Sequence, residues 1–368
     1  MTKTTLITID DVQAGRISER TIEHNAPVTP DFDPISHFRE TVLKSGAEHG
    51  KYGNLLEAFV QTPDAASLLR DGIRYLAFTA FGQRERSFTP FTTVFPSNRP
   101  HEEYLRDAGL GTMPKVVSGA EAPLVTSALD GGVKINNERY AHMIEVTQDD
   151  LRFDRVGKLR QIAPELGISA VNTLEAAVYA VITTTGNFTR NSTTGDNDVG
   201  ANTAATTFSA LGLEAAYATI ATAKDRKSGS YLGLMPDTII CGPRMRWPVL
   251  QLLMADNIVR ASANNAAEVR GTGTNPIYRG LIRNIVISPW FATTTSGYQW
   301  ALVDSTRTSL VLQEVEAFNI LQEGMDASSE AFLTRNSTRY LASMYFGVGM
   351  ADDRPWYYSS STTATTIS

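Results

Sequence analysis

The residue types that most often perform chemistry are few in this sequence, and their spacing does not build a catalytic or metal site. No two histidines are four residues apart, as two zinc ligands on one helical face would be. His101 is followed by two glutamates, but the second histidine of a zinc-peptidase motif is missing. We therefore interpret all the histidines as ordinary surface or core residues: His24, His37, His49, His101 and His142.

Glycine-rich and acidic stretches are the next places to look for phosphate or calcium binding. Segments 271–273 and 347–349 both lack the third glycine of a dinucleotide-binding loop, so both are predicted to be turns. Segment 196–200 begins like a calcium loop but lacks the remaining ligands and the closing Glu. The sequence therefore predicts no catalytic, cofactor-binding or metal-binding residue, and no cofactor.

Cys241 is the only cysteine and lies in an apolar run. A disulfide within the chain is therefore impossible, and a zinc site built from cysteines is excluded. We predict that Cys241 is an inert core residue rather than a nucleophile.

Charge and hydropathy exclude two further classes of protein. Lys plus Arg total 33 and Asp plus Glu total 39, so the formal net charge is −6. An acidic chain is unsuited to binding that depends on neutralising phosphates, although loose contact with nucleic acid stays possible. The first ten residues are too polar for a signal peptide, and no run approaches about 18 apolar residues, so no membrane span is expected.

The element that would position any functional residue is a long helical run from Thr147 to Thr185. Thr147 and Asp150 form a capping-box-like start. Pro164 cannot donate a hydrogen bond to residue 160, so a bend or break is expected between residues 160 and 167. The run should act as a strut. Its apolar residues recur at steps of three and four: Leu159, Ile162, Leu166, Ala170, Leu174, Ala177, Val178 and Val181.

A long hairpin is predicted just before this helix, over residues 115–146. Its outgoing side holds residues 116–125, Asp130-Gly-Gly132 supplies the turn, and residues 140–146 alternate as in a half-buried strand. The tip, residues 127–137, carries few residues to bury. Such a ribbon is marginal alone and is expected to rest on another surface.

The remaining segments mix helices and strands without regular βαβ alternation, which favours an α+β fold. A helix should start at Pro63, and residues 97–113 read as a loop with a possible helical turn. The tail 359–368 is nearly all Ser and Thr and is expected to be disordered. Further helices are predicted at 208–223 and 244–255 (Trp247, Leu250 and Met254 on one side), and strands at 88–95, 237–241, 281–287 (a central strand), 298–303, 309–320 and 339–348.

The block from Pro236 to Asp304 contains an ordered set of motifs. They are Pro236-Asp-Thr-Ile-Ile-Cys-Gly-Pro243, Asn275-Pro276, Leu281-Ile-Arg-Asn-Ile-Val-Ile-Ser-Pro289-Trp290 and Tyr298-Gln-Trp-Ala-Leu-Val-Asp304. This order resembles the major capsid proteins of tailed phages with the Hong Kong 97-like fold, and the resemblance covers roughly residues 62–358.

The resemblance implies an α+β Hong Kong 97-like capsid fold with an N-terminal arm, an extended hairpin (E-loop), a long spine helix, a peripheral sheet and a compact axial domain. The implied divisions are 1–61 (N-terminal arm), 62–114 (start of the peripheral domain), 115–146 (E-loop hairpin), 147–185 (spine helix), 186–304 (mostly axial domain) and 305–368 (return strands and polar tail). Residues 1–61 should contact neighbouring subunits or change conformation during assembly.

The resemblance also implies a function, which is structural and not enzymatic. Copies would form homo-pentamers and homo-hexamers of an icosahedral shell around double-stranded DNA, in the virion, after assembly in the host cytoplasm. Portal, scaffold and decoration proteins are the implied partners, with loose contact to DNA and none to membrane. Some members crosslink a hairpin Lys to a neighbour's Asn, but Lys134 is better explained as a solvated lysine.

Three other interpretations stay open at the level of sequence. The first is an encapsulin-like cellular compartment that encloses a protein cargo. The second is an unrecognised enzyme such as a hydrolase, and the third is a tail or baseplate protein that forms tubes or rings.

Overall fold

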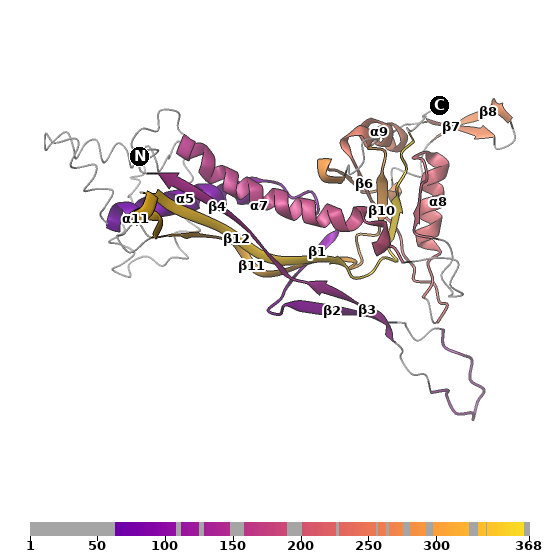
Figure 1. Cartoon of the computed structure of the whole chain (residues 1–368). Coiled ribbons are helices and arrows are strands. Elements are labelled where there is room, and N and C mark those ends of the chain that lie inside the picture. Colours follow the sequence, from indigo (N-terminus) through magenta and orange to yellow (C-terminus); the bar gives the residue numbers. More distant parts are fainter. Residues whose placement is uncertain are drawn as a thin grey trace, which may run out of the picture.

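A computed structural model gives the fold of the chain. The described residues are 63–107, 112–124, 129–147, 158–189, 201–225, 228–254, 257–262, 265–274, 280–291, 297–323, 330–335 and 337–363. The arm predicted at residues 1–61 and the calcium-like segment 196–200 lie outside them. The described part is elongated, with a long sheet and helix at one end and a compact mixed region at the other (Figure 1).

A four-stranded sheet forms the elongated part. In spatial order its strands are β1 (Thr92–Pro96), β11 (Leu310–Gln322), β12 (Ser337–Met350) and β4 (Glu138–Thr147). β1 runs parallel to β11, and the other pairs are antiparallel. The strands predicted at 309–320 and 339–348 are confirmed, as is the alternating segment 140–146.

Helix α7 (Lys158–Thr183) packs along one face of this sheet. Its buried stripe includes Leu166, Ala170, Leu174 and Val178, which confirms that part of the predicted apolar face. The stretch Gln161–Thr183 is long and apolar enough to span a membrane by length and composition. Half of its most apolar window is buried inside the molecule, where α7 packs on the sheet and on α5.

The continuity of α7 differs from the sequence-based expectation. Thr147 ends strand β4, and residues 148–157 lie outside the described part, so the helix start predicted at Thr147 stays a prediction. The bend predicted near Pro164 also stays a prediction, but a break there is wrong, because the helix continues through it. The flanking residues Ala163 and Leu166 are buried, so tertiary packing outweighs the one hydrogen bond that proline forfeits.

Helix α5 (Pro63–Gln83) lies against α7 and starts at the predicted proline. The two helices approach closely at Gly167, where a Cβ atom would lie 2.2 Å from the Ala77 carbonyl oxygen and 2.9 Å from the Phe81 nitrogen. Only glycine fits between these backbones. This contact fixes the position of α5 on α7. Because α7 packs on the four-stranded sheet, it also fixes α5 relative to that sheet.

A five-stranded sheet forms the compact region. Its order is β5 (Thr203–Ala204), β13 (Trp356–Ser359), β10 (Trp300–Val303), β6 (Thr238–Cys241) and β9 (Asn284–Ile287). The predicted strands β6 and β10 are confirmed. β9 is an edge strand, so its prediction as a central strand is wrong. It is apolar on both faces because Val286 belongs to one core cluster while Ile285 and Ile287 pack against the other.

Helices α8 (Ala210–Ala221) and α9 (Arg246–Met254) cover the outer face of this sheet. Ser209 caps α8 by accepting a hydrogen bond from the Gly212 N–H at 3.1 Å. In α9 the buried residues are Val249, Leu252 and Leu253. On the side predicted to carry Trp247, Leu250 and Met254, the first and last residues are exposed and Leu250 is half-buried. Short 3₁₀ turns occur at η1 (Thr185–Asn187), η2 (Pro243–Met245) and η3 (Pro289–Phe291).

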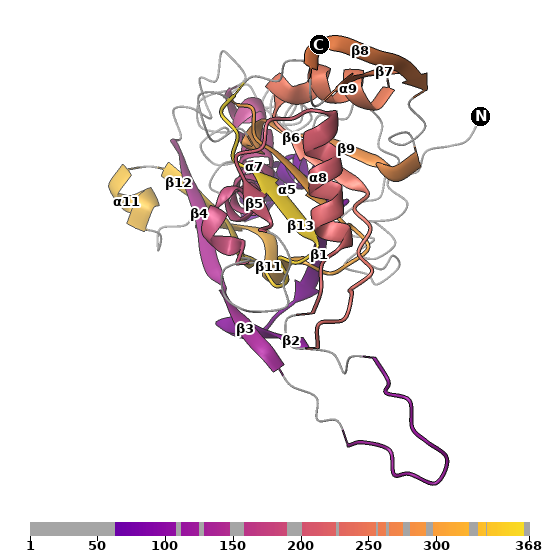
Figure 2. The ribbon, with the colours of Figure 1, turned by 90° about the vertical axis from the view of Figure 1, so that its right-hand side faces the viewer.

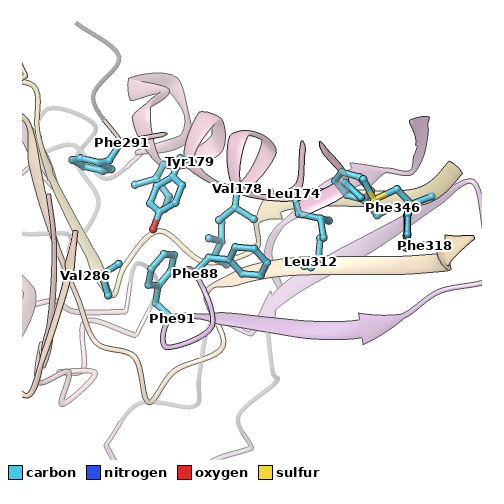
Figure 3. Packing of buried hydrophobic residues seen from close by; sticks show 14 of the residues in the cluster. Phe88, Phe91, Leu174, Val178, Tyr179, Val286, Phe291, Leu312, Phe318 and Phe346 are labelled. Atoms are coloured by element: carbon cyan, nitrogen blue, oxygen red, sulfur yellow. The ribbon is translucent and has the colours of Figure 1, made fainter. Parts of the chain in front are cut away.

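The two regions share one core at the end of α7. Tyr179 lies between Phe91, with ring centroids 6.1 Å apart, and Phe291, at 6.2 Å (Figure 3). Val286 of the compact sheet belongs to the same cluster. Successive residues of a strand in the compact sheet face opposite sides. Ile240 belongs to the cluster around Tyr179, and Cys241 belongs to the cluster under α8 and α9.

The hairpin projects from the long sheet but is built differently from the prediction. β2 (His101–Asp107), expected as a loop, pairs antiparallel with β3 (Leu129–Asn136). Asp130-Gly-Gly132 therefore lies in a strand. A reverse turn lies instead at 117–120, where the Ala120 N–H donates to the Val117 carbonyl at 3.0 Å and Gly119 has φ of 87°. The alternating segment 140–146 belongs to the sheet, because β4 pairs with β12.

Both glycine pairs predicted to be turns also lie in strands. Gly271 and Gly273 belong to β8 (Asn265–Thr274), which pairs with β7 (Asn257–Ser262). Gly347 and Gly349 belong to β12, where the hairpin base crosses so closely that side chains would clash. The tail predicted to be disordered begins with ordered residues instead. Ser359 is the last residue of strand β13, and Ser361 is buried. A short helix α11 (Glu330–Arg335) precedes β12.

Candidate functional site

Titratable side chains do not form a reactive centre in the described part of the chain. No group of three or more His, Cys, Asp or Glu residues there could hold a metal ion. Cys241 is fully buried, and burial raises the pKa of its thiol to about 12, so the thiol stays protonated near neutral pH. This agrees with the predicted core role. His142 is exposed on β4, with Nδ1 3.2 Å from the Ser169 hydroxyl of α7.

Two buried carboxylates, Glu175 and Asp353, accept hydrogen bonds from backbone and side-chain groups of other elements and so hold those elements together. Glu175 of α7 accepts from the Ser87 N–H and from the Ser87 hydroxyl, both at 2.6 Å. The same hydroxyl lies 2.7 Å from the Tyr179 hydroxyl. Asp353 accepts from the Thr189 N–H at 2.6 Å and from Asn202 Nδ2 at 3.2 Å. These networks join α7 and the compact sheet to neighbouring loops.

The most distinctive surface is the excursion, defined as residues 112–124 at the far end of the β2–β3 hairpin. It leaves the body of the molecule (Figure 2), and every residue in it is exposed. Met113 is 98% exposed, Leu124 97% and Val117 74%. Among the described residues nothing covers these apolar side chains, so the excursion is a candidate surface for contact with another molecule.

A second exposed apolar group lies on the compact region. Trp247 at the start of α9 is 78% exposed. Tryptophan is among the residues most enriched at protein–protein interfaces, so an exposed tryptophan marks a candidate contact surface. Exposed apolar side chains also come from α8, from the loop after it and from the end of α9: Leu211, Tyr231, Met235 and Met254.

Comparison with known proteins identifies the family of the chain. The family model described as phage capsid protein matches residues 132–359. The chain belongs to the phage capsid protein family. The match covers most of the return strand β3, helix α7, the five-stranded sheet, and strands β4, β11 and β12 of the four-stranded sheet. No curated protein matches the chain.

Solved capsid structures are similar to this chain. A chain from Mycobacterium phage Bobi has a TM-score of 0.48 and 15% identity, covering 76% of this chain and 92% of that chain. A chain from the capsid of a native GTA particle has a TM-score of 0.50 and 12% identity, covering 75% of this chain and 90% of that chain. The likeness to the GTA capsid chain confirms the α+β Hong Kong 97-like capsid fold expected from the motif order.

For a phage capsid protein, the functional site is the set of surfaces that join copies. Besides the excursion and the exposed tryptophan, a groove of about 430 Å³ lies between α7 and the base of the hairpin. Its walls include Ala177 and Val181 of α7 and Ile135 of β3, with Val348 of β12 between them. The groove offers a shaped surface, whereas the excursion offers protruding apolar side chains.

Two charged features mark the sheet and hairpin. Lys134 is exposed on β3 and lies opposite Glu103 of β2 in the register, which favours a solvated lysine with a cross-strand partner. At the far end of the sheet, Glu145 accepts a hydrogen bond from the Ser337 hydroxyl and lies 3.4 Å from Arg335 and 4.0 Å from Arg339. The Ser337 hydrogen bond, helped by the two arginines, lowers the pKa of Glu145.

The sequence-based prediction did not identify residues 112–124 as the projecting end of the hairpin, or their exposed apolar side chains as a surface. It treated residues 127–137 as the tip, although most of them form β3, and counted Val116, Val117 and Leu124 as strand residues. The available signal was Ser118-Gly119 between these residues, a pair suited to a turn that needs positive φ.

Proposed function

We propose that this chain is the major capsid protein of a tailed phage, a structural protein whose copies form the pentamers and hexamers of an icosahedral shell around double-stranded DNA. The family match carries the proposal. The exposed apolar excursion supports it, because a subunit that exposes Met113 and Leu124 gains stability when a neighbour covers them.

The architecture supports a division of labour within the subunit. The long sheet with α5 and α7 is proposed as the peripheral domain, the five-stranded sheet with α8 and α9 as the axial domain, and the β2–β3 hairpin as the E-loop. Tyr179 at the shared core couples the first two, so that strain at one could reach the other. Residues 1–61 are proposed to contact neighbouring subunits.

The proposed partners follow from a shell that is filled with DNA. They are further copies of the chain, a portal, a scaffold and decoration proteins, and DNA held loosely inside, which suits a net charge of −6. The proposed location is the virion, after assembly in the host cytoplasm. The family match favours this function over a cellular compartment, an enzyme or a tail protein.

Electron microscopy of the purified full chain tests the proposal. Closed shells are the expected result, and shells recovered from infected cells should protect double-stranded DNA from nuclease. Tubes or open rings would instead favour a tail or baseplate protein, and shells that retain a protein cargo without DNA would favour a compartment. A monomer that persists across salt and protein concentrations would overturn the proposal.

A further inference from the structure

On its return side, a single residue connects the projecting hairpin to the body of the subunit. The chain runs through β3, which pairs with β2, and then through β4, which pairs with β12. Only Asn137 separates the two strands, and it is buried. Any rotation of the hairpin relative to the sheet must therefore take place at this residue or at the other leg, residues 97–100.

Asn137 binds that other leg directly. Its backbone N–H donates to the Pro100 carbonyl at 2.9 Å, and its side-chain Nδ2 donates to the Arg99 carbonyl at 2.7 Å and to the Ser97 hydroxyl at 3.2 Å. The Ser97 N–H in turn donates to the Glu314 carbonyl of β11 at 2.9 Å. The two legs are thus tied to each other and to the sheet.

The glycines of β12 allow the hairpin base to lie directly on the strand. Gly347 and Gly349 are two residues apart and so share one face of β12. A Cβ atom at Gly347 would lie 2.5 Å from the Asn136 carbonyl oxygen and 2.5 Å from Asn137 Oδ1. A backbone oxygen cannot rotate away as a side chain can, so any larger residue at 347 must displace the hairpin.

A small apolar cluster completes the seat. Ile135 of β3 is buried with Val311 of β11 and Ala351, separately from the main core. Beside it, the fully buried Gln313 donates from Nε2 to the Tyr104 hydroxyl of β2 at 3.0 Å. These contacts give the base of the hairpin a fixed place, whereas among the described residues every residue of the excursion beyond it is exposed.

We propose that Asn137 and Gly347 form a joint that sets the direction in which the hairpin projects, and that this direction determines whether the excursion reaches the neighbouring subunit. The second half of the proposal rests on the proposed shell function. Asn137 is a positioning residue: it acts by orienting Met113, Val117 and Leu124 and makes no contact with the neighbour itself.

The test compares two variants of the joint with a glycine control. Asn137→Ala removes both side-chain hydrogen bonds, and Gly347→Ala adds the clash with the Asn136 carbonyl. In the control, Gly280→Ala, nothing lies within 4 Å of the added atom. Each full-length variant is measured for thermal unfolding, for particle yield by microscopy, and for the distance between spin labels at Glu121→Cys in the excursion and Ala218→Cys on α8. Cys241 is fully buried and is not expected to take the label.

Both joint variants should fold and should show a single unfolding transition. The distance between their spin labels should shift or broaden, and closed particles should be lost. Gly280→Ala should behave like the parent in all three measurements. Normal particles with an unchanged distance would overturn the proposal, as would lost particles with an unchanged distance. If Gly347→Ala fails to fold, Asn137→Ala decides. If the parent and Gly280→Ala form no particles, the shell function fails, and the label distance alone decides whether the joint directs the hairpin.

Discussion

The shared core around Tyr179 and the excursion are opposite solutions to the placement of apolar side chains. Tyr179 is fully buried between aromatic rings, and its hydroxyl contacts Ser87. The excursion keeps Met113 and Leu124 almost fully exposed. The difference separates two tasks: the first region makes a subunit that is stable alone, and the second is completed only by another molecule. Substitutions in the two regions should therefore have separable effects on unfolding and on assembly.

The largest loss of subunit stability is expected from Tyr179→Ala. Removing a fully buried aromatic ring costs about 3–5 kcal/mol, because the transfer free energy is lost and a cavity remains. Unfolding of the unassembled subunit by denaturant measures the loss. Tyr179→Phe keeps the ring and should cost only about 1–2 kcal/mol. Equal losses for the two variants would show that the hydroxyl, not the ring, holds this core.

A smaller loss is expected from Gly167→Ala, where α5 and α7 meet. The new Cβ atom would lie 2.2 Å from the Ala77 carbonyl, so the helices must separate. Overpacking of this kind typically costs about 1–3 kcal/mol. The control is Gly82→Ala on α5, where nothing lies within 4 Å of the added atom. A thermal midpoint for Gly167→Ala at or above that of Gly82→Ala would contradict the close approach of the helices.

A pH-dependent but modest effect is expected at Glu145. Its pKa is lowered, chiefly by the Ser337 hydrogen bond, so its contribution is present above the ordinary Glu pKa and is lost as pH falls through the lowered value. Glu145→Gln should therefore lower the thermal midpoint at neutral pH, and the difference from the parent should vanish in acid. Glu165→Gln, on the exposed side of α7, serves as the control. A difference that persists or grows in acid would contradict this assignment.

The sequence predicted best those elements whose starting residue or buried face is determined by residues close together in the chain. Pro63 starts α5, α8 lies within the predicted helix 208–223, and the apolar stripe of α7 matches its buried face. The failures depend on long-range contacts. Nothing local shows that Gly347 faces the hairpin base, that packing carries α7 through Pro164, or that β2 finds its partner beyond the excursion. Membership of the capsid family could be predicted because the motifs between Pro236 and Asp304 occur in a characteristic order, although each motif alone is a weak signal.

The smallest effect on unfolding, and the sharpest test of the comparison, is expected from the triple variant Met113→Ser, Val117→Ser and Leu124→Ser. All three side chains are exposed, so the free energy of unfolding should change by less than about 0.5 kcal/mol per site. Assembly should nevertheless fail, because full burial of each side chain by a neighbour would contribute about 1.5–3 kcal/mol, and every subunit in a shell repeats the contact.

A matched control lies in the same excursion: Lys115→Ser with Glu121→Ser removes two exposed charges of opposite sign and leaves the apolar side chains in place. Particle yield and thermal unfolding are measured on the parent, the triple variant and the control under identical conditions. Normal particles from the triple variant would show that the excursion is dispensable and would move the assembly surface to the compact region around Trp247. A subunit that unfolds early would instead show that the excursion is stabilised by its own chain, and the contrast with Tyr179 would no longer hold.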